Sequence, residues 1–384
     1  MAKYIPQHQQ SDVTVKFGPW PKGMNNRQPD YALPEGTLRN LVNVDVDNSG
    51  RLHRRAGMTK VHGGVACRGG FSCPLGTYFI EGVDLCQLND DNTSTVLFSG
   101  VHGPTPTYAF FNDVVYFSDG LITKTITTTG VHEWGIPVPA TPFAYVTSGA
   151  MPAGTYLVAV TSIDSAGRES GASDLAVVTI PELTTGALVV SGLPSTMGVR
   201  VYVSTPNGTT PFLVAELAAG TTSTTITNAE MGIGAPLVTQ QITPPPAGQI
   251  IRERAGRIYI ASDRVLWVTE PYAPDWVSLV SGFIMQADTI TVVEPVESGV
   301  WVVSDQTYFF RGDGPENFDV RPKLPYGAVS GTSSKIPYTS DVLWYSNRGL
   351  VLGTGDGQVK NLQEQDVAPH DGTSGAILVR EQNG

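Results

Sequence analysis

The chain of 384 residues is poor in charged side chains, in cysteine and in long apolar runs. Asp, Glu, Lys and Arg together make up 15% of it, whereas about 25% is usual for soluble domains. No segment approaches the ~18 consecutive apolar residues of a membrane-spanning helix. The first residues, MAKYIPQHQQSD, contain no apolar core of a secretion signal. We therefore expect a soluble protein with no membrane span that is synthesised in a cytoplasm.

The sequence also lacks the spacings that mark common catalytic and metal sites. The three cysteines, Cys67, Cys73 and Cys86, are odd in number and form no CxxC pair, which argues against a disulfide framework and a zinc site. There is no GxSxG, no P-loop lysine motif and no GxGxxG after a strand. The six histidines show neither an HExxH motif nor paired spacing; they are His8, His53, His62, His102, His132 and His370. We therefore assign no catalytic, cofactor-binding or metal-binding residue and expect no enzyme, although carboxylates that meet only in space leave no such signal.

The 24 Lys and Arg residues are outnumbered by the 35 Asp and Glu residues. The net charge is −11, and no basic stripe is present, which argues against sequence-specific nucleic-acid binding. An acidic wall can still face DNA that must slide past it. The one basic cluster, Arg51, Arg54 and Arg55, follows Asp45 and Asp47. We favour local ion pairs across a hairpin over a contact with a partner subunit or with phosphate.

Two acidic segments and one tripeptide are considered as binding motifs, and none is assigned a function. Asp45, Asp47 and Ser49 match the start of a calcium loop, but the twelfth position holds Ala56 in place of the required glutamate, so an EF-hand fails. The loop with Asp313 and Glu316 is interpreted as solvated turn chemistry. The RGD tripeptide at 311–313 is short enough to be a coincidence.

A repeated hairpin organises the rest of the chain. The run GRIYIASDRVLWVTEP at 256–271 predicts strands at 258–261 and 265–268, joined by a turn at Ser262-Asp263-Arg264. Related runs lie at 107–117, 300–310 and 342–352, with a weaker one at 77–88. One hairpin cannot bury both of its faces, so the copies must pack side by side. Radial packing of such hairpins, with outer strands added, is a β-propeller. Its blade cores are predicted to contain the aromatic residues Tyr259, Trp267, Trp301, Tyr308, Trp344 and Tyr345.

Two proline clusters, at 135–142 and 243–248, interrupt the repeats. Between them, GTYLVAVTSI at 154–163 predicts an alternating strand with Tyr156, Val158 and Val160 on one face. The pair Asn207-Gly208 predicts a hairpin turn. Further strands are expected at 199–203, 212–217 and 221–227. Short strands at this spacing indicate a β-sandwich, and GTYLVAVTSIDSAGRES with VRVYVS resembles fibronectin type III domains.

The two ends of the chain are expected to serve the propeller. Residues 34–41 give the only helix signal, for one or two helical turns, and residues 42–58 are interpreted as a hairpin with its turn at 48–50. Because closure removes strand edges, we expect this hairpin or a C-terminal strand at 376–380 to close the propeller. The predicted division is an N-terminal arm and closing hairpin (1–60), the first propeller part (61–142), the inserted sandwich (143–243), and the second propeller part with its closing strand (244–384). The fold class is all-β, a β-propeller of about five to six blades with an inserted β-sandwich.

Three runs near the N-terminus carry a family resemblance: GMNN at 23–26, LVNVDVDNSG at 41–50 and LHRRAG at 52–57. This block, about the first 60 residues, resembles the tail nozzle proteins of short-tailed bacteriophages, also called packaged-DNA stabilisation or tail hub proteins. The resemblance implies a virion protein that forms a ring, typically a homo-hexamer, beneath the portal and adaptor. Such a ring retains genomic DNA and conducts it during ejection without reading its sequence. The family has no catalytic residues to carry over.

The inserted sandwich departs from that family and is expected to dock tail fibres or spikes or to contact the host surface. Two other functions stay open. The first is a tail-associated adhesin or carbohydrate-binding receptor protein, with aromatic loops against sugars. The second is a propeller glycosidase whose carboxylates meet only in the fold.

Overall fold

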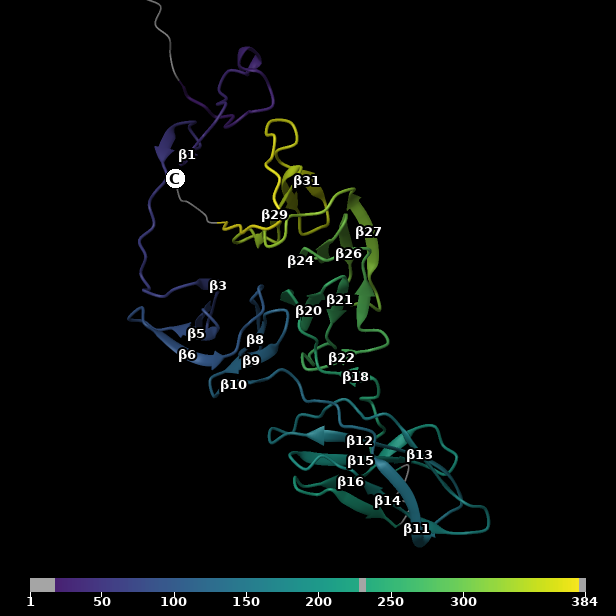
Figure 1. Ribbon diagram of the computed structural model, residues 1–384. Coiled ribbons are helices and arrows are strands. Elements are labelled where there is room, and N and C mark those ends of the chain that lie inside the picture. Colours follow the sequence, from purple (N-terminus) through teal and green to yellow (C-terminus); the bar gives the residue numbers. More distant parts are fainter. Residues whose placement is uncertain (1–17, 228–232, 380–384) are drawn as a thin grey trace, which may run out of the picture.

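The computed structural model describes residues 18–227 and 233–379. Within these ranges the protein is built from β-strands, with one short 3-10 turn, η1 (Asp30–Ala32), and no α-helix. Five four-stranded antiparallel sheets contain most of the strands, and two further sheets belong to residues 143–226 (Figure 1). No helix of the described part is long and apolar enough to cross a membrane.

The five four-stranded sheets follow one another along the chain. Sheet 1 contains β3 (Cys67–Cys73), β4 (Gly76–Glu81), β5 (Asp84–Leu88) and β6 (Ser94–Ser99). Sheet 2 contains β7 (Thr107–Phe111), β8 (Val114–Ser118), β9 (Thr123–Thr127) and β10 (Gly130–Glu133). Sheet 3 contains β19 (Ile250–Arg254), β20 (Arg257–Ser262), β21 (Val265–Val268) and β23 (Phe283–Met285). Sheet 4 contains β24 (Val292–Val296), β25 (Gly299–Val303), β26 (Thr307–Arg311) and β27 (Asp319–Leu324). Sheet 5 contains β28 (Ser333–Lys335), β29 (Val342–Ser346), β30 (Gly349–Gly353) and β31 (Val359–Asn361).

The sheets share one arrangement, because the first strand of each lies next to the first strand of the following sheet. These contacts join β3 to β7, β7 to β19, β19 to β24 and β24 to β28. Within each sheet the strands pair in chain order. The result is an arc of five sheets with their first strands inside (Figure 1).

The hydrophobic core of the arc is divided into four clusters, one between each pair of neighbouring sheets. Tyr78 and Phe117 belong to the cluster between sheets 1 and 2. The clusters between sheets 2 and 3 and between sheets 3 and 4 follow the same plan. Trp301 and Trp344, with ring centroids 5.5 Å apart, fill the cluster between sheets 4 and 5. No strand pairing in the described residues joins sheet 5 to sheet 1, so the arc is not a closed sheet.

The predicted hairpins are present in all five sheets. The hairpin at 256–271 forms β20 and β21, and Asp263 takes the positive φ of 53° that its tight turn requires. Four copies supply the second and third strands of their sheets, whereas the copy at 107–117 supplies the first and second strands of sheet 2. Tyr259, Trp301 and Trp344 are fully buried, which confirms their predicted place in the core, and Trp267 and Tyr308 pack against it.

Residues 143–226 form two sheets around one cluster of their own. One sheet contains β11 (Phe143–Met151), β14 (Gly186–Ser191) and β17 (Ser223–Ile226). The other contains β13 (Ala176–Ile180), β12 (Gly154–Ile163), β15 (Gly198–Ser204) and β16 (Pro211–Leu217). The predicted strand at 154–163 is confirmed with Tyr156, Val158 and Val160 fully buried, and Asn207 turns between β15 and β16 with φ 59°.

This inserted unit is joined to sheet 3 beside the short pair β18 (Ile242–Thr243) and β22 (Val277–Ser278). The Arg168 guanidinium contacts the Asp275 carboxylate at 2.9 Å. The Trp276 indole N–H donates to the Glu169 carbonyl at 2.8 Å. Burial raises the pKa of Asp275 above its usual range, although the charge of Arg168 opposes this effect.

The helix expected at 34–41 is absent. Only a single turn forms, in which the backbone N–H and the hydroxyl of Thr37 both donate to the Pro34 carbonyl. Gly36 adopts φ +84°, which a continuing right-handed helix does not allow. Leu38 instead forms a parallel bridge with Met24.

Neither proposed closing element closes the arc. The hairpin is present as β1 (Val44–Val46) and β2 (Leu52–Arg54), but these strands pair only with each other. Residues 55–66 lead from it to sheet 1 without forming a strand. In the tail, residues 376–379 form no strand, and position 380 lies outside the described residues. The tail bonds instead to sheet 5, where the Gly375 N–H donates to the Ser330 carbonyl at 2.9 Å.

Candidate functional site

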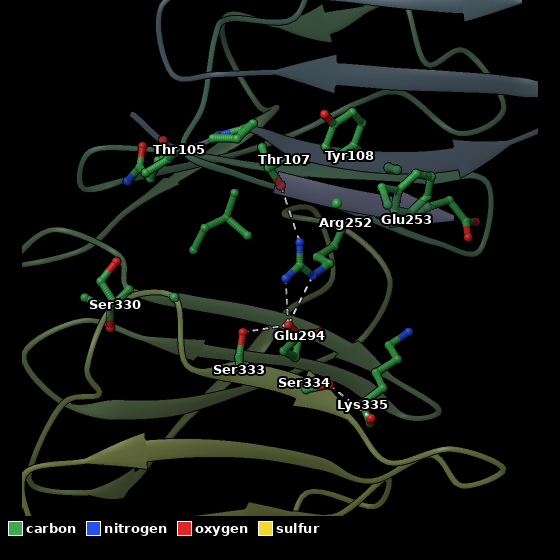
Figure 2. Close-up of a pocket in the computed structure, with 18 of the residues that line it drawn as sticks. Thr105, Thr107, Tyr108, Arg252, Glu253, Glu294, Ser330, Ser333, Ser334 and Lys335 are labelled. Atoms are coloured by element: carbon green, nitrogen blue, oxygen red, sulfur yellow. Dashed lines mark hydrogen bonds and ion pairs between the residues drawn. The ribbon is translucent and has the colours of Figure 1, made fainter. Parts of the chain in front are cut away.

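The first strands of the arc surround a cavity of about 720 Å³. Its walls come from β3, β7, β19 and β28 and from Glu294 on β24, so all five sheets contribute to it (Figure 2). The lining combines apolar side chains such as Phe71 and Ile250 with charged ones. Residues from every sheet of the arc thus meet at this cavity.

A chain of polar contacts crosses the cavity. The Arg252 Nε and Nη2 atoms both donate to Glu294 Oε1, at 3.1 and 2.9 Å. The Ser333 hydroxyl donates to the same oxygen at 2.7 Å, and Arg252 Nη1 lies 3.5 Å from Thr107 Oγ1. Glu294 is only 2% exposed. The contacts therefore tie sheets 2, 3, 4 and 5 together around one buried carboxylate.

The polar contacts of Arg252 and Glu294 in the cavity, which we call the joint, hold neighbouring sheets together. Glu294 Oε1 already accepts three hydrogen bonds, and a buried charge of this kind is stable only while its partners remain. Glu253, the other carboxylate of the lining, bends away from Glu294 (Figure 2). A glycosidase needs two carboxyl groups that face each other across a sugar bond. This geometry favours a tie between sheets over glycoside hydrolysis.

The second region of interest is the N-terminal arm, which we define as residues 18–66. The turn of its hairpin lies against Pro19 and Pro21. Between these prolines, the Trp20 N–H donates to the Gly50 carbonyl at 2.7 Å. Gly50 has φ +77°, and a Cβ added there would lie 2.7 Å from the nitrogen of Pro21. Glycine is therefore required at this turn both for its dihedral angles and for space.

The charged cluster of the hairpin is satisfied largely within the arm. The Arg55 guanidinium contacts Asp45 at 2.9 Å, which confirms the local ion pair for that arginine. Asp47 accepts the N–H groups of Ser49 and Arg51 and contacts His53 at 2.9 Å. The His53 hydrogen bond lowers the pKa of Asp47 below its usual range. The Asp47 carboxylate thus caps the hairpin turn, and the hydrogen bond from Arg51 to it comes from the backbone N–H.

The arm is tied to the C-terminal segment through the asparagines of the GMNN run. Asn25 donates to the Asp366 carboxylate at 3.0 Å, and Asn25 itself is 1% exposed. The backbone N–H of Asn26 donates to the Asp366 carbonyl at 3.0 Å, and the Ala368 N–H donates to the Asn26 side chain at 2.6 Å. Arg27 donates to the Val367 carbonyl at 3.0 Å. The GMNN run therefore forms a defined contact with residues 366–368.

The arm also leaves large apolar side chains uncovered. The strongly exposed apolar residues of the arm are Tyr31, Val42, Met58, Val61 and Val65. The arm is thus tied to the C-terminal segment by residues 25–27 and exposes apolar side chains elsewhere along its length.

The loop with Asp313 and Glu316 is more structured than expected. Asp313 contacts Arg254 at 2.8 Å, and Glu316 pairs with Arg257. The Tyr259 hydroxyl donates to the Asp313 carbonyl at 2.8 Å. The loop therefore fastens sheet 4 to sheet 3, although its two carboxylates remain half exposed.

No protein-family model matches the chain, and no curated protein matches it. Among solved structures, it is similar to the extracellular domain assigned to a one-component system of B. thetaiotaomicron, with a TM-score of 0.30 and 9% identity over 78% of this chain and 34% of that one. It is also similar to PorZ, a surface component of the type-IX secretion system of Porphyromonas gingivalis, with a TM-score of 0.20 and 10% identity over 82% of this chain and 50% of that one. The chain thus spans half or less of these structures, and likenesses this distant assign no function.

Proposed function

We propose that this chain is a structural subunit of the tail nozzle of a short-tailed bacteriophage. In this role it forms a ring beneath the portal and adaptor, retains packaged DNA and conducts it during ejection. The observation that carries the proposal is the N-terminal block that resembles nozzle proteins. Its Asn25 and Asn26 anchor an arm whose remaining length exposes apolar side chains. An anchored arm with uncovered apolar contacts suits a subunit that joins its neighbours.

The fold supports the same role. We propose that the five sheets are the blades of a β-propeller, and that the unit between the proline clusters is a fibronectin III-like β-sandwich inserted into it. The division at about residues 60, 142 and 243 follows from the sequence. Support comes from the first strands lying inside and from the core clusters between successive sheets. Sheets packed in series make a stiff frame, which a DNA conduit requires.

The charge balance suits a conduit that does not grip DNA. The net charge of −11 repels the phosphate backbone. Arg55 of the one basic cluster is engaged with Asp45, so it is less available to neutralise phosphates. The partners expected from the resemblance are further copies in a homo-hexamer, the portal and adaptor proteins, and tail fibres or spikes.

The test is assembly. The full chain is mixed with the portal and adaptor of the same virion and examined by mass photometry and negative-stain imaging. We expect rings on the portal-adaptor complex, and we expect fewer rings with Asn25→Ala and Asn26→Ala together, because the arm loses its anchor. Thr129→Ala, on an exposed turn of sheet 2, is the matched control. A chain that stays monomeric and does not bind the complex would overturn the proposal.

One observation favours a tail-associated adhesin as the second candidate. Phe143 and Tyr145 are both strongly exposed on β11 of the inserted unit, and residues two apart on a strand share one face. Exposed aromatic pairs offer flat surfaces to sugar rings. Glycan-array binding by the full chain that Tyr145→Ala abolishes would favour this function over the nozzle. Absence of binding to any glycan would exclude it as a carbohydrate receptor.

A further inference from the structure

Three side chains with metal-binding chemistry meet where the arm joins sheet 1. His62 lies in the arm, Cys67 opens β3, and Glu81 ends β4. Cys67 and Glu81 are direct register partners, so their side chains lie on one face of the sheet. One ligand atom from each of the three residues lies within 4.8 Å of the other two. In the described part of the chain, no other group of His, Cys, Asp and Glu meets this criterion.

The surroundings of His62 orient its ring for coordination. The Nδ1 atom lies 2.8 Å from the Asn92 carbonyl, so Nδ1 carries a proton and donates it there. The other ring nitrogen, Nε2, faces Glu81 Oε2 at 3.3 Å. Metal-binding histidines commonly donate one ring N–H to a backbone carbonyl in this way, which directs the other nitrogen to the metal. The ring also packs edge-on against Phe79, with centroids 5.2 Å apart.

Glu81 is held in a similar manner. Its Oε1 atom accepts the Val65 N–H at 3.0 Å, and the Ser94 hydroxyl approaches Oε2 at 3.4 Å. These bonds fix the carboxylate while leaving Oε2 turned toward His62. Outer hydrogen bonds of this kind orient the ligands of a metal ion.

A glycine keeps the space around the ligand atoms open. A Cβ added to Gly64 would lie 2.5 Å from His62 Nε2 and 2.7 Å from Glu81 Oε1. Gly64 does not have a positive φ, so glycine is needed here because a side chain would not fit. Any larger residue would occupy the volume next to the ligand atoms.

We propose that His62, Cys67 and Glu81 bind a zinc ion, with the fourth position open to water or to a ligand from a partner. Imidazole, thiolate and carboxylate are all zinc ligands, and zinc accepts mixed sets in tetrahedral geometry. Bonds of about 2.0–2.3 Å separate tetrahedral ligand atoms by roughly 3–4 Å, so the cluster needs to contract by about 1 Å. Cys67 is exposed and can supply that movement by changing its rotamer. On binding, the thiol proton leaves to solvent and the thiolate coordinates the metal.

One nearby charge opposes cation binding. The Lys60 ammonium donates to the Gly63 and Gly64 carbonyls, at 3.4 and 3.0 Å. A thiolate and a carboxylate still outweigh this single positive charge. The site would fasten the base of the arm to the face of sheet 1 that has no neighbouring sheet, and it does not depend on the proposed nozzle role.

The test uses the full chain, reduced and freed of metal by a chelator. Zinc is titrated in competition with a chromogenic chelator, and cobalt is added separately as a spectroscopic probe. We expect one zinc per chain and a thiolate-to-cobalt charge-transfer band. Cys67→Ser and His62→Gln should each weaken zinc binding by about tenfold or more and, for Cys67→Ser, remove the band.

The controls are Cys73→Ser, from the other end of β3, and His102→Gln, an exposed histidine outside the cluster. Both should bind zinc as the parent does. Every variant should still melt cooperatively without metal, which separates a lost ligand from a lost fold. Substoichiometric binding by the parent would overturn the proposal, and so would equal binding by Cys67→Ser with the band retained.

Discussion

The inserted unit and the arc of five sheets differ in how they bury the apolar faces of their strands. In the inserted unit, residues from both sheets enter one cluster, among them Tyr156, Leu188 and Val201. In the arc, each cluster is shared by two neighbouring sheets, and sheets 2, 3 and 4 each take part in two clusters. The inserted unit is therefore complete in itself, whereas each sheet of the arc depends on its neighbours.

The two end sheets of the arc show the consequence. Sheet 5 turns Trp344 toward sheet 4, and its opposite face carries the register pairs Leu343–Leu352 and Tyr345–Leu350, all of them partly exposed. Sheet 1 has a free face as well, and His62 covers part of it through Phe79. The N- and C-terminal segments bond to each other at Asn25 and Asp366. The ends of the arc are thus connected by loops, without the sheet pairing that would close it.

The largest effect is expected when a large core side chain is removed from one region only. Trp301→Ala, between sheets 4 and 5, should destabilise the arc by about 3–5 kcal/mol, because it leaves a cavity against Trp344. The inserted unit has its own cluster and should melt as before. Scanning calorimetry of the full chain measures both transitions.

The matched control is Tyr156→Ala, which removes a fully buried aromatic residue from the inserted unit. It should lower the melting temperature of that unit and leave the arc unchanged. A single transition that moves in both variants would show that the two regions fold as one.

The next largest effect concerns the joint inside the arc. Glu294→Ala leaves the Arg252 guanidinium without its charged partner and should cost about 3 kcal/mol. The double variant Arg252→Met with Glu294→Leu removes both charges and should recover most of that loss, since paired removal leaves no buried charge. Urea unfolding of the three proteins gives the free energies. If the double variant is as unstable as Glu294→Ala, the joint stabilises the arc through side-chain packing instead of charge.

A smaller effect is expected at the connection between the two regions. Trp276→Phe keeps an aromatic ring but removes the hydrogen bond to the Glu169 carbonyl, and should cost about 1 kcal/mol. The loss should appear as a wider separation of the two calorimetric transitions, because the units are coupled there. Tyr338→Phe, at an exposed aromatic residue of sheet 5 outside that connection, is the control. An unchanged separation in Trp276→Phe would show that the bond carries no coupling.

Much of the fold could be predicted because its signals are local. The alternation of apolar residues around Asp263 and the Asn207-Gly208 pair each predicted a hairpin that the structure confirms. The position of a hairpin within its sheet was not visible, and the copy at 107–117 supplies the first strand of sheet 2. That position depends on which neighbour covers each face, and a local pattern does not contain this information. The helix at 34–41 was wrong because the conformation of Gly36 outweighs the propensity of the residues around it.

The candidate sites could not be read from spacing, since their members are distant in sequence. The bonds that Arg252 makes to Thr107 and Glu294 span 145 and 42 residues, and the bond from Ser333 to Glu294 spans 39. His62 and Glu81 are 19 residues apart and match no metal motif. Only the pairing of β3 with β4 brings Cys67 opposite Glu81. The missing information is strand register for Cys67 and Glu81, and the packing of neighbouring sheets for the contacts of Glu294.

The smallest predicted effect is a pH dependence at the same connection between the regions. Burial raises the pKa of Asp275 in the folded protein above its ordinary value of 3.8. The folded state therefore binds more protons than the unfolded state just above pH 3.8, and the contribution of Asp275 to stability falls as the pH rises through that window. Asp275→Asn cannot ionise, so its stability relative to the parent should increase between pH 3.5 and pH 7. Urea unfolding at both pH values, with Asp305→Asn as an exposed control, measures this difference. A relative stability that decreases over the same range would show that the attraction of Arg168 outweighs the cost of burying the carboxylate.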